Sequence, residues 1–519
     1  MLTFKPTKDS HYYLLGVLVL LLVVVINRFP AGYVFGGGDT IQLIEAKDSF
    51  KNLFFDWQGR AGIFYAVFYF LSFIGINDTI QLSFYLGIFI IGSYISFDLF
   101  TRLIFKETPA ITRLLISLFY ALNLFTLYAF TANWGYSYFL SLYIFVPILV
   151  GLYMKYIKTG KYIFGAFFVL VLFFGSSGFG NPAFAISFSI LLFFLTLTLF
   201  IVGKIEINQK FVLNLAIISF FSVLVNAYWI NTVIFIAKDE VQELFSGNII
   251  DLNWWLSHTS NPIINTVRLM HYSNDYFPDN FPYKADFLKT VFKLLSFLPI
   301  ILIISGLIFL RKMRSTYKKY FLSFGALLTL LVVLVARLRP PFEILNYYLY
   351  NTWGMNTLRG YDKTAIYVPF IIGVLLLIFF IHMKNKKMAL VLMLLLILIP
   401  FPFFTGKIQQ NLSYRFSNSK AENKDFREAK YSFLVKIPEE YFEIRNIINR
   451  DKTKSFVATL PYSSNDGSGI ANYPKWQLYG ADITEHLYNK DLIEANRSYF
   501  KGWNFAQEFN SESRNPEWV

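Results

Sequence analysis

Residues 368–400 read VPFIIGVLLLIFFIHMKNKKMALVLMLLLILIP, and this stretch decides the class of fold. The stretch contains three lysines, Lys384, Lys386 and Lys387, with one apolar run before them and another after them. With the residues just outside the quoted stretch, each run falls within the roughly 17 to 25 residues that a helix needs to cross a bilayer. The stretch therefore predicts two membrane-spanning helices joined by a short basic turn.

The same pattern recurs along the whole chain. Of its 519 residues, 55% are hydrophobic and only 15% are charged, so one soluble core could not bury its apolar surface. We predict an all-α polytopic membrane bundle of about eleven transmembrane helices, with membrane lipids as its main solvent. The predicted spans are 12–28, 80–99, 111–131, 136–157, 162–179, 183–203, 211–236, 288–310, 319–337, 364–383 and 387–404.

Charge and cysteine content exclude several classes of protein. A net charge of +14 would suggest a nucleic-acid partner for a soluble protein. Here the lysines and arginines lie in short clusters between the apolar runs, so we interpret them as topology signals and expect no nucleic-acid partner. The chain has no cysteine, which excludes disulfides, thiolate metal sites and cysteine nucleophiles.

Residues 61–76, AGIFYAVFYFLSFIGI, determine the predicted orientation. If they crossed the membrane, the basic turn with Arg102 and Lys106 would share a side with the acidic loop around Asp39. If they lie in the interface as an amphipathic or re-entrant helix, every basic cluster between spans falls on one side, which the positive-inside rule makes cytoplasmic. We therefore predict an interfacial helix, a cytoplasmic N-terminus and residence in the plasma membrane.

The opposite side carries three long loops and a polar tail. Residues 1–404 would form the transmembrane domain, with exterior loops at 29–79, 238–287 and 338–363. Residues 405–519 would form a small α+β domain on the extracellular or periplasmic side. Loops of that length are usually functional or disordered, so the functional residues are expected on this side.

Two stretches of the tail carry signals of secondary structure. In KIPEEYFEIRNIINR (436–450), Pro438 and the two glutamates after it suit the first turn of a helix. SFVATLPY (455–462) predicts a strand that ends at Pro461. These are the predicted helix and strand of the exterior domain.

The first exterior loop offers one prominent carboxylate. Asp39 follows three glycines in GYVFGGGDTIQLIEAKDSF (32–50), which allow a tight backbone path close to the membrane surface. Asp39 could act as a general base, or orient a donor phosphate through a metal such as magnesium or manganese. Alternatively it caps a helix that starts near Thr40, with the glycines as a plain turn. No DxD pair occurs in this loop, so the sequence does not specify a dedicated site for a divalent metal.

Further polar residues of the exterior loops are candidate substrate ligands. Glu45 and Asp48 would share one face of a helix, which equally describes a solvated face. In the second loop, His271 lies in RLMHYSNDYFPDNFPY (268–283), a mixture of aromatic and polar residues that suits sugar stacking or the membrane interface. We include Glu45, Asp48 and His271 among the candidate substrate-binding residues.

Four cations of the third exterior loop run against the positive-inside bias. Arg337 and Arg339 follow one predicted span, while Arg359 and Lys363 precede the next. A phosphate at the interface would explain them, and ordinary lipid headgroup binding with snorkelling is the alternative. We predict a phosphate-binding role for Arg359 and Lys363.

The chain resembles the GT-C class of polyprenyl-phosphate-dependent membrane glycosyltransferases, most nearly the α-(1→3)-arabinofuranosyltransferase-like group. Four short motifs carry the resemblance: GGDT (37–40), GIFYAVFYFLSFIGINDTIQLSFYLGIF (62–89), NAYW (226–229) and LRGYDKTAIYVPF (358–370). The last is similar to an Arg-x-x-x-Lys element that opens a late span. The resemblance covers most of residues 1–404 as architecture, while the tail is shorter than the carbohydrate-binding extensions of arabinofuranosyltransferases proper.

The resemblance implies an inverting glycosyltransferase. A sugar would move from a polyprenyl-phosphate donor to a glycan, glycolipid or glycoprotein on the non-cytoplasmic side. Asp39 would be the acidic catalytic residue, and Arg359 with Lys363 would hold the lipid-linked phosphate. The alternatives are a transporter or flippase of lipid-linked saccharides, and a non-catalytic scaffold with an exterior recognition domain. Nearly uncharged spans argue against a transporter, since transporters typically bury ionisable residues at mid-span.

Overall fold

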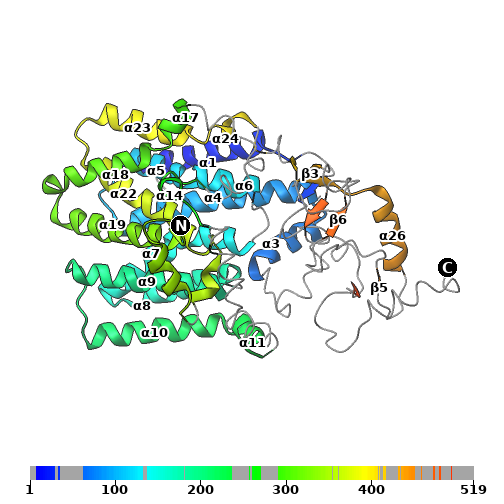
Figure 1. Cartoon of the computed structure of the whole chain (residues 1–519), viewed down its shortest axis with the longest axis horizontal. Helices are drawn as coiled ribbons and strands as arrows, with labels where there is room; N and C mark the ends of the chain where they lie inside the picture. The colour runs from blue at the N-terminus through cyan, green and yellow to red at the C-terminus, as the bar shows by residue number, and fades with distance from the viewer. Residues whose placement is uncertain are drawn as a thin grey trace, which may run out of the picture.

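The structure is a computed structural model in which a helical bundle carries a set of short strands at one end (Figure 1). It describes residues 8–29, 33–35, 62–76, 78–132, 137–179, 182–235, 256, 260–270, 290–352, 355–360, 362–406, 408, 413–415, 430–432, 434–450, 457–458, 471–473, 478–480 and 492–493. We call the end with the strands and α26 (Glu439–Arg450) the strand end. The opposite end, where α9 turns into α10 and α18 into α19, is the basic end.

The bundle is built from helices at each of the predicted spans. They are α1 (Lys8–Ile26), α4 (Asp78–Ile104), α5 (Ala110–Ala121), α6 (Leu124–Ala132), α7 (Ser137–Thr159), α8 (Tyr162–Phe174), α9 (Pro182–Ile201), α10 (Gln209–Val225), α11 (Ala227–Phe235), α17 (Thr290–Leu295), α18 (Leu298–Ile308), α19 (Ser315–Ala336), α22 (Val368–His382), α23 (Lys386–Leu398) and α24 (Pro402–Thr405). Short helices fill the connections: η2 (Ser176–Phe179), α14 (Ile263–Val267), η3 (Leu310–Lys312), α20 (Glu343–Tyr350), η4 (Met355–Arg359) and α21 (Asp362–Ala365).

Within the described residues, eight helical stretches are long and apolar enough to cross a membrane. Three of these stretches join two of the helices above: α5 with α6, α17 with α18, and α21 with α22. The structure thus supports an integral membrane protein, while the count of eleven spans stays a prediction. The three remaining predicted spans contain the shorter helices α8, α10 and α23, each followed directly by another short helix.

The centre of the bundle is α22. Every residue from Val368 to Phe380 is buried, and the helix packs against α5, α18 and α19. By contrast, α1 exposes Leu14, Leu18 and Leu22, which lie four residues apart on one face. That spacing places an apolar stripe on the outside of a helix, as lipid contact requires.

Helix α3 (Gly62–Phe73) occupies the stretch predicted to lie in the interface. Its 12 residues correspond to about 18 Å of helix, which is shorter than the ~30 Å apolar core of a bilayer. The length is consistent with a helix that does not cross. The protein's orientation in the membrane stays a prediction.

The first exterior loop and the tail meet at the strand end. Strand β1 (Tyr33–Phe35) pairs antiparallel with β4 (Leu434–Lys436), with Val34 opposite Val435. Beneath this pair, the Asn27 side chain donates to the Phe403 carbonyl at 2.7 Å, which ties the end of α1 to α24. The segments before Asp39 and after the last span therefore lie together.

The described part of the tail contains one helix and several two-stranded pairings. Helix α26 coincides with the predicted helix, and β5 (Val457–Ala458) lies inside the predicted strand. The other strands are β2 (Ser413–Arg415), β3 (Lys430–Ser432), β6 (Ala471–Tyr473), β7 (Leu478–Gly480) and β8 (Leu492–Ile493). β2 pairs with β3 and β6 with β7, both antiparallel, whereas β5 pairs with β8 in parallel. A single folded α+β domain over 405–519 stays a prediction.

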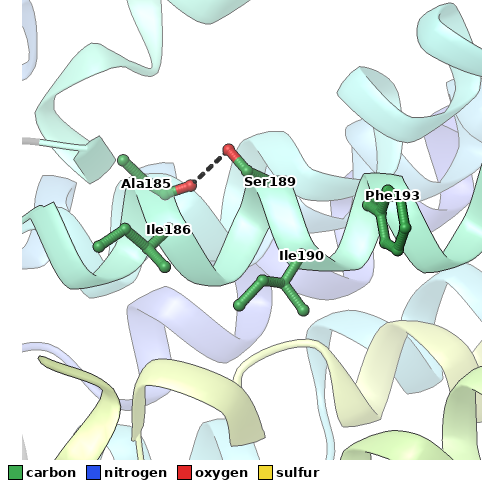
Figure 2. A pocket seen from close by; sticks show the side chains of 5 residues that line it. All are labelled: Ala185, Ile186, Ser189, Ile190 and Phe193. Atoms are coloured by element: carbon green, nitrogen blue, oxygen red, sulfur yellow. Dashed lines mark hydrogen bonds between the residues drawn. The ribbon is translucent and has the colours of Figure 1, made fainter. Parts of the chain in front are cut away.

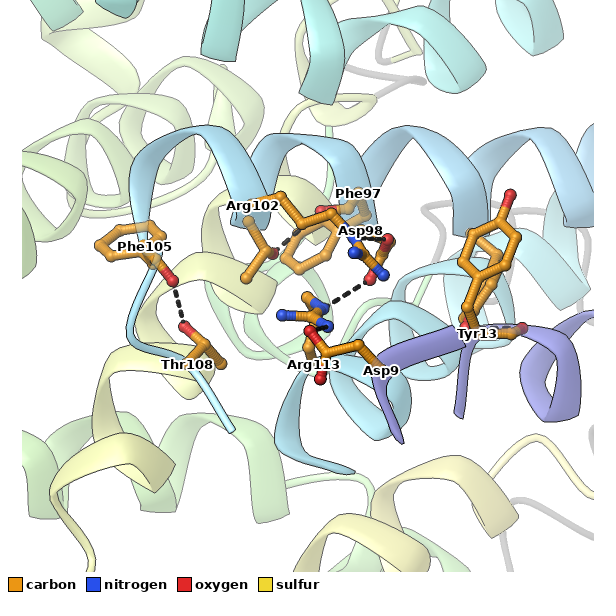
Figure 3. A network of polar contacts seen from close by, with 10 residues as sticks. Asp9, Tyr13, Phe97, Asp98, Arg102, Phe105, Thr108 and Arg113 are labelled. Carbon is orange, nitrogen blue, oxygen red and sulfur yellow. Dashed lines mark hydrogen bonds and ion pairs between the residues drawn. The ribbon is translucent and has the colours of Figure 1, made fainter. Parts of the chain in front are cut away.

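A buried ion-pair network joins three helices near the basic end (Figure 3). Asp98 of α4 accepts from Arg102 at 2.6 Å and from Arg113 of α5 at 2.9 Å. Arg113 also reaches Asp9 of α1 at 3.0 Å. The side chains of Asp98 and Arg113 are 3% and 6% exposed, so each neutralises a charge that water does not reach.

Asp98→Ala is expected to destabilise the protein strongly, because it leaves the buried Arg113 charge without this partner. Removing one member of a buried pair typically costs about 3–5 kcal/mol. The readout is the thermal unfolding midpoint of the purified protein in detergent. Glu107→Ala is the matched control, since the Glu107–Arg314 pair is about 70% exposed and such pairs contribute little. Equal midpoints for the two variants would contradict a structural role for the network.

Candidate functional site

The candidate site lies where α19 ends and α22 begins, at the end opposite to the basic turns. Helix α20 folds back over the last turn of α19, and two of its buried side chains satisfy carbonyl groups there. Asn346 donates to the carbonyls of Val333 and Arg337 at 2.7 and 2.9 Å. Tyr350 donates its hydroxyl to the Leu334 carbonyl at 2.8 Å. This connection completes the helix end, whose carbonyls have no partner within the helix.

Arg337 is the residue at which α19 stops. It is fully buried, and its φ of +49° lies in a region that side-chain-bearing residues rarely adopt. The guanidinium donates to the Leu358 carbonyl at 3.0 Å and lies 5.7 Å from the centre of the Tyr350 ring. A cation at a helix C-terminus also interacts favourably with the helix dipole. Arg337 therefore fixes η4, four residues before Lys363.

Lys363 lies in α21 against helix α9. Its ammonium is 4.3 Å from the centre of the buried Phe184 ring, and its side chain is half-buried. Such a cation–π contact holds the charge at the end of the bundle. Close by, the hydroxyls of Ser187 in α9 and of Tyr367, the residue before α22, lie 2.9 Å apart and join the two helices.

An open apolar groove starts on α9 directly after Phe184 (Figure 2). It has a volume of about 430 Å³ and is lined by Ala185, Ile186, Ser189, Ile190 and Phe193. The Ser189 hydroxyl donates to the Ala185 carbonyl at 2.8 Å, so it presents little polarity to the groove. Ile186 and Ile190 pack against the cluster that contains Tyr350 and Leu358, which links the groove wall to Arg337.

Two more arginines secure the neighbouring segment, residues 260–270. Arg339 donates to the Ser260 hydroxyl at 3.0 Å. Arg268 is buried, donates to the Ser296 hydroxyl at 2.7 Å and lies 4.8 Å from the centre of the Phe297 ring. These contacts connect residues 260–270 to the junction of α17 and α18 and to the segment that follows α19.

The structure covers only part of the predicted site. Asp39, Glu45, Asp48 and His271 lie outside the described residues, so their roles stay predictions. Arg359 is the last residue of η4, and nothing is described of its side chain. Of the predicted ligands, Lys363 is placed, against Phe184 of α9. The apolar groove on the same helix was not among the sequence predictions. Among the described residues, no group of three or more His, Asp or Glu side chains could hold a metal ion.

Arg337 is the residue whose role the sequence did not reveal. Arg337 directly follows an apolar run, on the side where the positive-inside rule predicts few cations. This position marked the residue as unusual. Its buried contact with a carbonyl 21 residues later depends on the fold of the loop. The sequence therefore flagged the residue without distinguishing a phosphate ligand from a structural cation.

We expect Arg337→Ala to lower the unfolding midpoint clearly, since a buried carbonyl that loses its donor costs about 1–3 kcal/mol. Arg337→Gly should be less harmful than Arg337→Ala, because glycine adopts positive φ without strain. Arg311→Ala, an equal change of charge at an exposed residue, is the control. A midpoint for Arg337→Ala no lower than that of Arg311→Ala would refute the structural assignment.

Comparisons with known proteins identify structures that share this fold. No protein-family model matches the sequence, and no curated protein matches it. The structure is similar to that of the arabinofuranosyltransferase AftD from Mycobacteria, with a TM-score of 0.55 and 10% sequence identity over 93% of this chain and 31% of that chain. A mutant of the same protein gives a TM-score of 0.58 at 10% identity, over 94% and 33% of the two chains.

The chain therefore spans about a third of the length of the structures it matches. Identity at this level shows a shared fold alone. The fold agrees with the GT-C-like architecture that the sequence resemblance implies, and the protein has the polytopic membrane fold seen in a mycobacterial arabinofuranosyltransferase.

Proposed function

We propose that the protein is a membrane glycosyltransferase that moves a sugar from a polyprenyl-phosphate donor to an acceptor on the non-cytoplasmic side. The observation that carries this proposal is the half-buried ammonium of Lys363 against α9, the same helix that lines an open apolar groove. An amphiphile with an anionic head and a hydrocarbon tail matches both parts. The structural neighbour is named as a glycosyltransferase, which supports the same class of reaction.

The donor would lie with its phosphate beside Lys363 and its chain along α9. From Ala185 to Phe193 the groove lining advances eight residues, or about 12 Å of helix. This length accommodates the first isoprene units, and the remaining chain would continue into the lipid. Arg359, four residues before Lys363, would supply a second cation to the phosphate.

The proposed reaction is a single displacement at the anomeric carbon. An acceptor hydroxyl attacks that carbon, the bond to the phosphate oxygen breaks, and polyprenyl phosphate leaves with the electron pair. Asp39 accepts the proton of the attacking hydroxyl. Lys363 and Arg359 stabilise the charge that develops on the departing phosphate, and most of the rate would come from this and from positioning.

One observation also fits a second candidate function. A groove open along the outside of α9 could guide a lipid-linked saccharide that is moved across the membrane without chemistry. The two candidates differ in product, because transfer yields a glycosidic bond and free polyprenyl phosphate, whereas translocation returns the donor intact.

Asp39→Asn should reduce sugar transfer at least a thousandfold, since the amide does not accept the acceptor's proton at neutral pH. The assay follows a panel of labelled polyprenyl-phosphate sugars with the full-length protein in proteoliposomes, and separates glycosylated product from returned donor. Donor binding and the unfolding midpoint should stay unchanged. Full transfer activity in Asp39→Asn would remove Asp39 from the mechanism, and intact donor appearing in the other leaflet would favour translocation.

The proposed donor site predicts different effects for substitutions at Lys363, which would bind the phosphate, and at Ser189, which lines the groove. Lys363→Gln should raise the donor KM roughly tenfold or more, as expected for the loss of a charge-assisted phosphate contact worth about 1.5–3 kcal/mol, and leave the acceptor KM unchanged. Ser189→Trp should block long-chain donors more than a donor with a two-isoprene chain.

Two variants serve as controls for this pair. Lys293→Gln removes an exposed lysine of α17, and Leu170→Trp places a tryptophan at an exposed position of α8. Both should keep wild-type donor kinetics. If Lys363→Gln raises donor and acceptor KM equally, or if Ser189→Trp affects short and long donors alike, the proposed donor site is wrong.

A further inference from the structure

Five lysines from four different parts of the chain gather at the basic end of the bundle, opposite to the end that holds the proposed phosphate site. We call this set the lysine cluster: Lys106 between α4 and α5, Lys155 and Lys158 at the end of α7, Lys204 between α9 and α10, and Lys319 in the first turns of α19. Their convergence depends on the packing of the helices and not on one basic stretch of sequence.

The turn after α9 brings two of these ammonium groups together. Lys319 donates to the Gly203 carbonyl at 3.0 Å, and Lys204 lies 4.8 Å from the centre of the Tyr320 ring. Gly203 has a φ of +65°, and a side chain there would come within 3.3 Å of the Lys319 ammonium. Both lysines are half-buried, so the fold holds them and does not leave them to swing freely in water.

The lysines act on one another electrostatically. Burial lowers the pKa of Lys204, and the positive charges of Lys158 and Lys319 lower it further. Lys155 and Lys158 are three residues apart at the end of α7, so both lie on one face of that helix. Like charges held at this range repel each other, and a bound anion relieves that repulsion.

Carboxylates of the described residues do not neutralise the cluster. Glu107 pairs with Arg314, while Asp98 and Asp9 pair with Arg102 and Arg113. Glu206 lies two residues after Lys204, but it is exposed and forms no ion pair with the cluster in the part of the chain that the structure describes. The cluster therefore presents net positive charge.

Apolar side chains beside the cluster indicate the kind of anion. Ile201 is 70% exposed at the end of α9, and Ile207 is 54% exposed in the turn that follows. A free phosphate ion gains nothing from contact with apolar side chains. The acyl chains of a lipid, by contrast, would cover these side chains and shield them from water. Basic pockets between transmembrane helices are known to hold phospholipid headgroups.

We propose that the lysine cluster is a binding site for the headgroup of an anionic phospholipid in the leaflet at the basic end, the leaflet predicted to be cytoplasmic. The phosphate lies between Lys204, Lys319 and Lys158, and the acyl chains run past Ile201 along the outside of the bundle. The bound lipid bridges α7, α9 and α19.

The test is a lipid titration of the full-length protein in detergent, monitored by native mass spectrometry. The probes are cardiolipin, phosphatidylglycerol and phosphatidylcholine. The double variant Lys204→Gln/Lys319→Gln should bind cardiolipin and phosphatidylglycerol at least tenfold more weakly, given about 1 kcal/mol for each lysine near the surface. Phosphatidylcholine binding should be weak in the wild type and unchanged in the variant.

Lys384→Gln/Lys387→Gln is the matched control, because it removes two exposed lysines from another turn of the same end. It should change affinity for the anionic lipids by less than about twofold, and Lys204→Arg/Lys319→Arg should retain binding because it keeps both charges. If the double glutamine variant does not fold, Lys158→Gln, at an exposed residue, tests the same site with a smaller expected loss.

Three results would overturn the proposal. The first is an equal loss of binding in the Lys384→Gln/Lys387→Gln control, which would indicate only general charge attraction. The second is wild-type affinity for phosphatidylcholine equal to that for cardiolipin. The third is displacement of the lipid by millimolar inorganic phosphate, which would identify a site for a free ion. None of these results bears on sugar transfer, so the proposed function is tested separately.

Discussion

The contact between the Arg337 guanidinium and the Leu358 carbonyl determines the geometry of the whole candidate site. A helix that ends in or near lipid needs partners for its last carbonyls, and α20 supplies them from Asn346 and Tyr350. This return of the chain leaves Arg337 buried, where its charge is tolerated only with several partners. Because Leu358 immediately precedes the segment that carries Lys363, the same contact sets the position of Lys363 above Phe184. A structural cation thereby positions a candidate ligand.

Cations at the two ends of the bundle differ in kind. At the strand end, Arg268 and Arg337 are buried and donate to a hydroxyl and a carbonyl, which suits a guanidinium with its five donors in fixed directions. At the basic end, Lys204 and Lys319 are half-buried point charges beside turns and apolar side chains. An ammonium is compact and strongly hydrated, so it remains available at a membrane surface. The first arrangement stabilises loops, and the second is adapted to a mobile anionic ligand.

Apolar run length predicted the helices well, because the bilayer sets one physical scale for them all. Helices α4, α19 and α22 lie where 80–99, 319–337 and 364–383 were predicted. The predicted span 111–131 corresponds to a candidate span at Ala110–Ala129, but its helix is interrupted between α5 and α6. There the Asn123 side chain caps the second helix and donates to the Tyr120 carbonyl at 2.8 Å. An asparagine inside an apolar run gives little warning of this break. The groove on α9 was likewise hidden, because it depends on which neighbours leave Ile186 and Ile190 partly uncovered.

The proposed chemistry needs a base and a phosphate site that belong to different parts of the chain, and different contacts anchor the segments next to each. Asp39 follows Phe35, the last residue of β1, by four residues. Strand β1 is held by β4, and α1 by the Asn27 contact with α24. The strand that precedes Asp39 in sequence is thus anchored by the tail, whereas Lys363 is anchored by the bundle through Arg337. A tail that pairs with this loop would influence catalysis without contributing a catalytic residue, because it limits where the base can lie relative to the donor phosphate.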